Sequence, residues 1–148
     1  MAAGIDGVRL TPLAVMPHPD GDVLHGIRAD SPGFCGFGEA YFSTVGLRRI
    51  KAWKRHRLMT LNIIVPIGEV RFVIHDDRSD SPSRGLTMAF DLSRCHYSRL
   101  TVLPGLWTGF MGLGDGLNML LNVADMPHDP AEADRCAVDA ITYAWDLN

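Results

Sequence analysis

The sequence has few cysteines, no long apolar run and no excess of basic charge. Its three cysteines (Cys35, Cys95 and Cys136) are odd in number and show no paired spacing, so we expect neither a disulfide framework nor a cysteine-based zinc site. Reduced cysteines favour a cytoplasmic location. No apolar run reaches the roughly 18 residues of a membrane span, and the first ten residues do not resemble a signal peptide.

The charge balance argues against a nucleic-acid partner. The chain has 14 Lys and Arg against 17 Asp and Glu, for a net charge of −3. The basic residues nevertheless concentrate in one run, from Arg48 to Arg57. This run has two readings, which the residues alone leave open. It is either a solvated strand edge or part of a pocket for an anion such as a nucleotide diphosphate.

Long helical periodicity, internal repeats and linkers are also absent, so we expect one domain over residues 1–148. Fifteen glycines and nine prolines separate short apolar segments at roughly ten-residue spacing, which is typical of many short strands. One short helix is expected at 130–136, where Asp129 is a candidate N-cap before Pro130 and Glu132. This pattern predicts an all-β double-sheet barrel of the jelly-roll or cupin type with a short C-terminal helix. Strands are expected at 7–16, 22–30, 39–45, 46–57, 61–65, 69–75, 86–92, 93–103, 107–111 and 117–125.

The most informative stretch is 51–78, where two β-branched runs flank a turn signal at 66–68. If 46–57 is extended, alternation places Lys54 and His56 on the face that starts apolar. The same alternation places Lys51, Trp53 and Arg55 on the opposite face. A face that starts apolar and ends polar fits a strand that runs from the packed floor of a barrel to its open mouth.

Metal chemistry is not indicated. Cupin metal sites need two histidines two residues apart with a nearby Glu, and a further histidine after a Pro-Gly turn. Here the corresponding positions are Lys54, His56, Leu61 and, after the turn, Thr108. A single imidazole does not hold a transition metal without partners. We therefore expect neither a metal nor a cofactor.

Acid–base chemistry is the stronger hypothesis. Lys54 and His56 are expected on one inner face, close enough to share a site. A lysine in an apolar barrel next to another cation has a lowered pKa, which suits it to proton transfer or to a Schiff base. Histidine could carry the proton instead. A plainer alternative is that both residues bind a phosphate or pair with Asp76 or Asp77. Asp139 is a candidate carboxylate partner for either residue.

The sequence resembles the dTDP-4-dehydrorhamnose 3,5-epimerases and their RmlC-like cupin relatives. The most specific match is the motif Asp-x-Arg-x-x-Ser-Pro-x-x-Gly, which here spans residues 76–85. The next is Pro104-Gly105 followed by Gly109-Phe110. The resemblance implies a homodimeric jelly-roll barrel with a sugar-nucleotide site in its mouth, and cofactor-free proton removal next to a ketone. Matching segments are 37–45, 50–56, 68–85, 99–110 and the tail from 120 to 145.

The resemblance also assigns roles to positions. The catalytic histidine of the epimerases falls at Lys54, their arginine at Lys51 and their second histidine at Thr108. The tyrosine that acts as the catalytic acid in the epimerases falls near Leu121. The carboxylate partner of their histidine falls at Asp139.

The same matching segments imply roles for further residues. His56 stands where sugar 3,4-ketoisomerases carry the second histidine of a His-x-His pair. Catalytic roles are therefore expected for Lys54, His56 and Asp139. Substrate-binding roles are expected for Glu39, Tyr41, Lys51, Arg78, Trp107 and Thr108.

Two functions follow as hypotheses. The first is an epimerase or isomerase of a nucleotide-linked 4-keto-6-deoxy sugar, with Lys54 and His56 as the proton-transfer pair and Lys51 near the diphosphate. The second is a non-catalytic cupin that binds a sugar nucleotide or serves as a partner subunit. Turnover of a keto sugar distinguishes them.

Overall fold

Two five-stranded antiparallel sheets form the body of the molecule. The computed structural model describes residues 4–146. One sheet has the strand order β1-β9-β6-β11-β4 and the other β12-β5-β10-β7-β8. The strands of the first sheet are β1 (Val8–Pro12), β4 (Glu39–Thr44), β6 (Leu61–Ile67), β9 (Ser98–Val102) and β11 (Met119–Ala124). Those of the second are β5 (Ile50–His56), β7 (Glu69–His75), β8 (Thr87–Ser93), β10 (Trp107–Gly112) and β12 (Ala133–Arg135).

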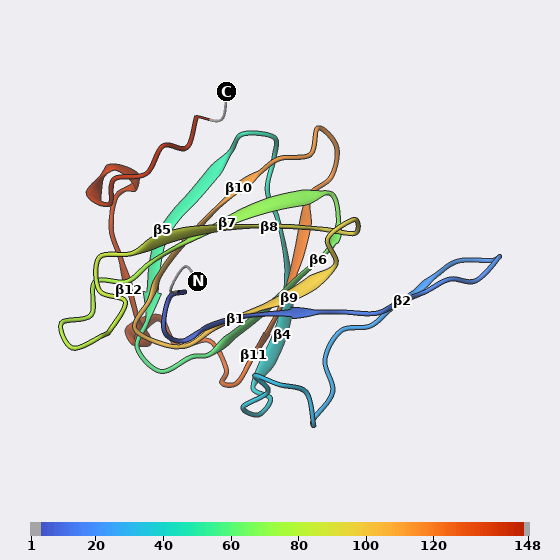
Figure 1. Ribbon diagram of the computed structural model, residues 1–148, viewed down its shortest axis with the longest axis horizontal. Coiled ribbons are helices and arrows are strands. Elements are labelled where there is room, and N and C mark those ends of the chain that lie inside the picture. Colours follow the sequence, from blue (N-terminus) through green and yellow to red (C-terminus); the bar gives the residue numbers. More distant parts are fainter. Residues whose placement is uncertain (1–3, 147–148) are drawn as a thin grey trace.

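From β4 onward the chain alternates between the sheets, except at the β7–β8 hairpin. This alternation produces the jelly roll, and Figure 1 shows the two sheets curving around a common interior. Apolar side chains from both sheets pack together in that interior, among them Val65, Phe72, Ile74 and Leu100. Each such buried side chain stabilises the fold by roughly 1.5–3 kcal/mol. The predicted all-β cupin architecture is confirmed.

The predicted turn at 66–68 is a corner and not a hairpin. β6 and β7 lie in opposite sheets, and Gly68 passes the chain between them with φ at 77°. A side chain there would approach the Leu117 carbonyl oxygen to 2.4 Å. Glycine is therefore required both for its positive φ and for space.

The predicted C-terminal helix over 130–136 is wrong. In place of that helix is one 3₁₀ turn, η1 (Pro130–Glu132), which is followed directly by strand β12. Asp129 does cap this turn, because its side chain accepts a hydrogen bond from the Ala131 backbone N–H. No longer helix forms because residues 133–135 pair with the end of β5 as strand β12. A second 3₁₀ turn, η2 (Val138–Ala140), follows.

A two-stranded arm departs from the barrel. It consists of β2 (Val15–Met16) and β3 (Val23–Leu24), which pair with each other and with neither large sheet. Figure 1 shows this hairpin projecting well beyond the rest of the molecule.

Within residues 4–146, no helix has the length and apolar character needed to cross a membrane.

Candidate active site

A cavity of about 310 Å³ opens between the two sheets. Its size is within the range of small-molecule sites. The inner part of its wall is apolar, whereas three basic side chains border it. No carboxylate lines it among the described residues, so the cavity favours a ligand that is anionic at one end and apolar at the other. Its lining residues are Tyr41, Ser43, Lys51, Ala52, Trp53, Lys54, His56, Leu61, Ile63, Phe72, Thr108, Phe110, Leu120, Asn122 and Arg135.

His56 lies in this cavity with its ring fixed by a carboxylate. It is the last residue of β5, and its Nδ1 contacts the Oε1 atom of Glu132. The other oxygen of Glu132 accepts hydrogen bonds from the backbone N–H groups of Leu58 and Met59, at 3.2 and 3.3 Å. Both side chains are buried, so this pair is shielded from water. The contact orients the imidazole, and among residues 4–146 its Nε2 atom has no hydrogen-bond partner.

The charges of this pair follow from its contacts. Burial opposes ionisation of Glu132, but hydrogen bonds from His56, Leu58 and Met59 outweigh it and hold the pKa of Glu132 below its ordinary value. Burial lowers the pKa of His56, and the Glu132 contact offsets only part of that effect. At neutral pH the imidazole is therefore neutral. Because an ionised carboxylate only accepts hydrogen bonds, the proton is on Nδ1, and Nε2 carries a basic lone pair.

Lys54 is directly opposite Arg135 in the register of β5 and β12. Directly opposed residues share a face of the sheet, so both cations line the cavity. Burial is the main cause of a lowered pKa at Lys54, and the charge of Arg135 lowers it further. Glu132 and Glu39 partly oppose this shift. The structure therefore places Lys54 and His56 together in one cavity, as alternation predicts.

Lys51 also lines the cavity, although alternation predicts the opposite face. On β10, Thr108 pairs with Lys54 and Phe110 pairs with Lys51, so three residue steps of β5 oppose two of β10. This bulge adds one residue to β5 and turns Lys51 to the same side as Lys54. The ammonium of Lys51 donates to the Thr44 carbonyl at 2.8 Å and lies 5.8 Å from the centre of the Phe110 ring.

Strand β10 divides its predicted residues between two environments. Thr108 and Phe110 line the cavity, whereas Trp107 and Met111 pack on the other side of the sheet with Trp145. The hydroxyl oxygen of Thr108 is buried and has no hydrogen-bond partner in the described part of the chain. Such an atom in a cavity wall fits contact with a ligand. Trp107 lies outside the cavity, where its Nε1–H donates to Asp77 at 2.9 Å and its ring contacts Arg55.

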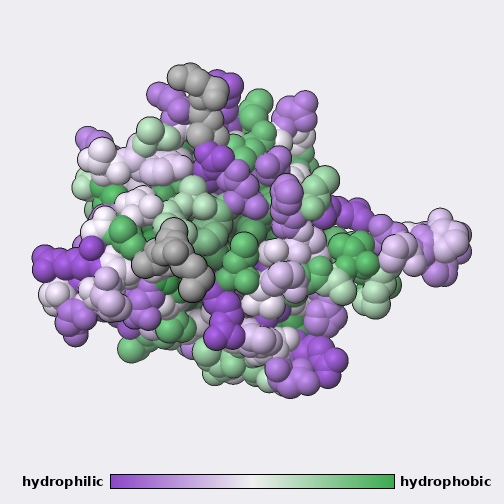
Figure 2. All heavy atoms as spheres, in the orientation of Figure 1, coloured by the Kyte–Doolittle hydropathy of each residue, from purple (hydrophilic) through white to green (hydrophobic). Residues whose placement is uncertain are grey.

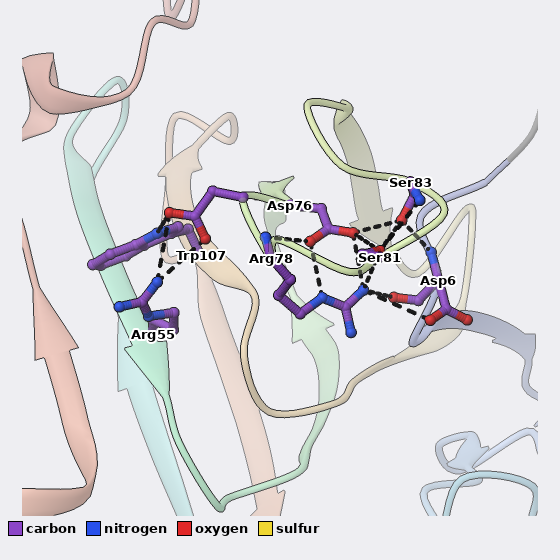
Figure 3. Close-up of polar contacts among 8 residues, drawn as sticks. Asp6, Arg55, Asp76, Arg78, Ser81, Ser83 and Trp107 are labelled. Atoms are coloured by element: carbon purple, nitrogen blue, oxygen red, sulfur yellow. Dashed lines mark hydrogen bonds and ion pairs between the residues drawn. The ribbon is translucent and has the colours of Figure 1, made fainter.

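Arg78 is directed away from the cavity. Figure 3 shows its guanidinium turned toward Asp76, Ser81 and Asp6. It donates to both oxygens of Asp76 at 2.9 Å and to the Asp6 carbonyl at 2.7 Å. Its place in the structure is thus to hold the loop after β7 against the N-terminal segment, and the substrate-binding role expected for it is not supported by its contacts.

Of the remaining predicted residues, one lines the cavity and two lie outside it. Tyr41 lines the cavity from β4, and its hydroxyl oxygen accepts a hydrogen bond from Asn122 at 3.2 Å. Glu39 is the first residue of β4 and does not line the cavity. Its charge nevertheless raises the pKa of Lys54, against the effect of burial. Asp139 is exposed in η2 and borders a separate surface hollow. The carboxylate that contacts His56 is Glu132, so the predicted pairing with Asp139 is wrong.

Sequence reasoning missed three residues of the site. It placed Glu132 in the first turn of a helix, gave Arg135 no role and left Asn122 inside an apolar strand. The acidic residue just after a capped proline was a usable signal for Glu132, but its contact with His56 spans 76 residues. Among residues 4–146, no group of three or more His, Cys, Asp or Glu side chains is arranged to hold a metal ion.

Comparison with known proteins gives relatives of one kind. No family model matches the chain. A crystal structure of a dTDP sugar isomerase from Desulfovibrio desulfuricans G20 is 42% identical with a TM-score of 0.92, over 95% of this chain and 92% of that one. The curated "Probable low-salt glycan biosynthesis epimerase Agl13" of Haloferax volcanii is 29% identical over 113 residues, which are 74% of this chain and 72% of the relative.

A more distant structure shares the fold. The dTDP-4-dehydrorhamnose 3,5-epimerase from Elizabethkingia anophelis NUHP1 is 13% identical with a TM-score of 0.82. The match covers 100% of this chain and 86% of that one. At this identity the match speaks for the fold alone.

Proposed function

Because this chain belongs to the RmlC-like family of dTDP-sugar isomerases and epimerases, as a divergent member, we propose that it catalyses proton transfer next to the ketone of a nucleotide-linked 4-keto-6-deoxy sugar. The reaction needs no metal and no cofactor. The observation that carries the proposal is the His56–Glu132 pair, which presents a basic nitrogen in a cavity lined by three cations. We keep a cytoplasmic location as a prediction from the sequence.

The base in this proposal is Nε2 of His56. A ketone acidifies the hydrogens on its neighbouring carbons, and a neutral imidazole removes one of them as the C–H electrons become an enolate. The ionised carboxylate of Glu132 stabilises the imidazolium that results. Since Glu132 also fixes the ring, the base needs no reorientation during the step.

Lys54 stabilises the enolate. Lys54 is two residues from His56 on β5, and its side chain lines the same cavity. A cation held beside a developing oxyanion in a partly buried site lowers the barrier. The lowered pKa of Lys54 makes it a better proton donor to that oxygen than an ordinary lysine.

The remaining lining fits the two ends of such a ligand. Lys51 and Arg135 supply positive charge for a diphosphate. Leu61, Ile63 and Leu120 give an apolar surface, which suits the methyl group of a 6-deoxy sugar.

The test is solvent exchange. The protein is incubated with dTDP-4-keto-6-deoxyglucose in D₂O, and deuterium on the carbons next to the ketone is followed by NMR against a sample without protein. We expect catalysed exchange that falls by about 10³-fold in His56→Asn. The exposed His128→Asn serves as the matched control and is expected to keep the full rate. Tight binding of dTDP sugars without catalysed exchange of any of them would instead support the non-catalytic binder.

We also propose that the protein is a homodimer. The arm formed by β2 and β3 belongs to neither large sheet, and a lone two-stranded hairpin is only marginally stable in water. Its Met16 and Val23 are 47% and 56% exposed. A second copy of the chain that covers the arm accounts for both features.

A further inference from the structure

The cavity has two walls, and they differ in the protons they can supply. His56, Lys54 and Arg135 belong to the sheet that contains β5 and β12. The facing wall comes from β4, β6 and β11 of the other sheet. Among the described residues of that facing wall, one side chain carries an ionisable group, the phenol of Tyr41. The members of the facing wall are Tyr41, Ser43, Leu61, Ile63, Leu120 and Asn122.

Tyr41 is held by a fixed amide. Asn122 is directly opposite it in the β11–β4 register and is almost fully buried. The side-chain oxygen of Asn122 accepts from the backbone N–H of Asn62 at 3.1 Å, which fixes which end of the amide is the donor. The amide nitrogen of Asn122 therefore donates to the phenol oxygen at 3.2 Å.

This arrangement leaves the phenolic proton of Tyr41 available. The phenol oxygen is occupied as an acceptor, and within residues 4–146 its O–H donates to no other group. Tyr41 is 40% exposed as a residue, so solvent reaches its side chain and can return a lost proton. The lone pair on Nε2 of His56 and the O–H of Tyr41 thus reach the same cavity from opposite sheets.

We infer that Tyr41 is a catalytic acid that completes an inversion at carbon, which makes the reaction an epimerisation. This inference rests on the proposed function. His56 removes the proton from one face of the carbon next to the ketone, and the C–H electrons form the enolate. The enolate then takes the Tyr41 proton on the opposite face, and the C–O double bond re-forms. Solvent reprotonates the tyrosinate, and the imidazolium returns its proton to solvent.

The alternative to epimerisation is a keto-shift, which requires a different placement of the catalytic groups. A keto-shift between adjacent carbons can be completed from one face, because the group that removes the proton can return it to the neighbouring carbon on the same side, so groups on one wall are enough. His56 and Lys54 would suffice for that reaction, and the phenol on the facing wall would have no part in it. The stereochemistry of the product therefore decides whether Tyr41 acts.

The experiment separates exchange from inversion. Wild-type protein and Tyr41→Phe are incubated with dTDP-4-keto-6-deoxyglucose in D₂O, and NMR follows both deuterium incorporation and the inverted sugar. We expect Tyr41→Phe to keep exchange within about 3-fold while inversion falls by about 10²-fold. Tyr143→Phe removes the same hydroxyl from a tyrosine outside the cavity and is expected to change neither rate.

Each other outcome rejects the role of Tyr41. Inversion by Tyr41→Phe at the wild-type rate would do so and leave the proposed function intact. A wild-type product that is keto-shifted without inversion would do the same. Absence of catalysed exchange in the wild type would remove the proposed function together with this inference.

Discussion

The imidazole of His56 depends on a single carboxylate for its orientation and its tautomer. Glu132 contacts Nδ1 of His56 and is itself held by the backbone of Leu58 and Met59. An amide in place of the carboxylate can still accept a hydrogen bond, but it carries no charge to stabilise the imidazolium. The charge of Glu132, more than its shape, therefore supports proton removal.

We predict that Glu132→Gln lowers kcat for exchange by about 10²-fold or more, with little change in KM. The contact with Glu132 raises the pKa of His56 against the effect of burial. Without the charge that pKa falls further, so the acid limb of the rate–pH profile moves to lower pH. A profile of kcat/KM between pH 4.5 and 8 measures this shift.

Asp139→Asn is the matched control, because it makes the same chemical change at the exposed carboxylate in η2. We expect the rate and the profile of this variant to equal those of the wild type. A loss in Asp139→Asn without a loss in Glu132→Gln would contradict the assignment.

The position of a site residue was predictable where the alternation of side chains along one strand fixes the face on which it lies. Lys54 and His56 are two residues apart on a strand, so period-two alternation was enough to put them side by side. Lys51 required knowledge of the bulge opposite Thr108, which depends on the pairing with β10. Glu132 required a contact across 76 residues, and no local pattern encodes such a contact.

At the scale of elements, the loop after β7 is stabilised by one buried carboxylate. Asp76 is fully buried and accepts hydrogen bonds from Arg78, Ser81 and Ser83. The bonds from Arg78 are the largest cause of the lowered pKa of Asp76, burial opposes them, and the two serines add to them. The motif that gave the best sequence match is therefore structural in this chain (Figure 3).

We predict that Asp76→Asn destabilises the protein by about 3 kcal/mol at pH 7. A carboxylate with a lowered pKa stabilises the fold fully above its ordinary value of 3.8, and this contribution is lost as the pH falls below it. The difference between wild type and variant should therefore shrink in acid. Urea unfolding at pH 7 and pH 3.5 measures it.

Asp80→Asn makes the same substitution at an exposed position of the loop. It should change the free energy of unfolding by no more than about 0.5 kcal/mol. An equal loss in the two variants, or a loss in Asp76→Asn that grows in acid, would contradict the prediction.

Elements were predicted best where a run of strand-forming residues is bounded by turn signals. The strands expected at 39–45, 69–75, 86–92, 107–111 and 117–125 correspond to β4, β7, β8, β10 and β11. β12 was missed because three residues are too few to show alternation, and because the capped proline before it favours a helix locally. Pairing with β5 decides the outcome there, and this pairing also brings Arg135 to the site.

At the scale of the whole molecule, the sheets were predictable and their exposed surfaces were not. Strand spacing implied a double-sheet barrel with strands at 7–16 and 22–30, but nothing in the sequence indicated that the adjoining ends of these two strands leave the barrel. Figure 2 shows that the tip of this arm is hydrophilic, while hydrophobic residues gather at its base. Water-facing apolar residues at the base of an arm are typical of a surface that another chain covers.

The arm yields the last prediction, that the protein has twice the 16.3 kDa mass of one chain in solution. Met16→Asp combined with Val23→Asp places charge on the arm and should shift the population to monomer, because burying unpaired carboxylates is unfavourable. Leu117→Asp, at a similarly exposed residue in the turn before β11, should stay dimeric. Light scattering after size-exclusion chromatography measures the masses. A monomeric wild type at all concentrations, or dimers that survive both arm substitutions, would show that the arm does not hold two copies together.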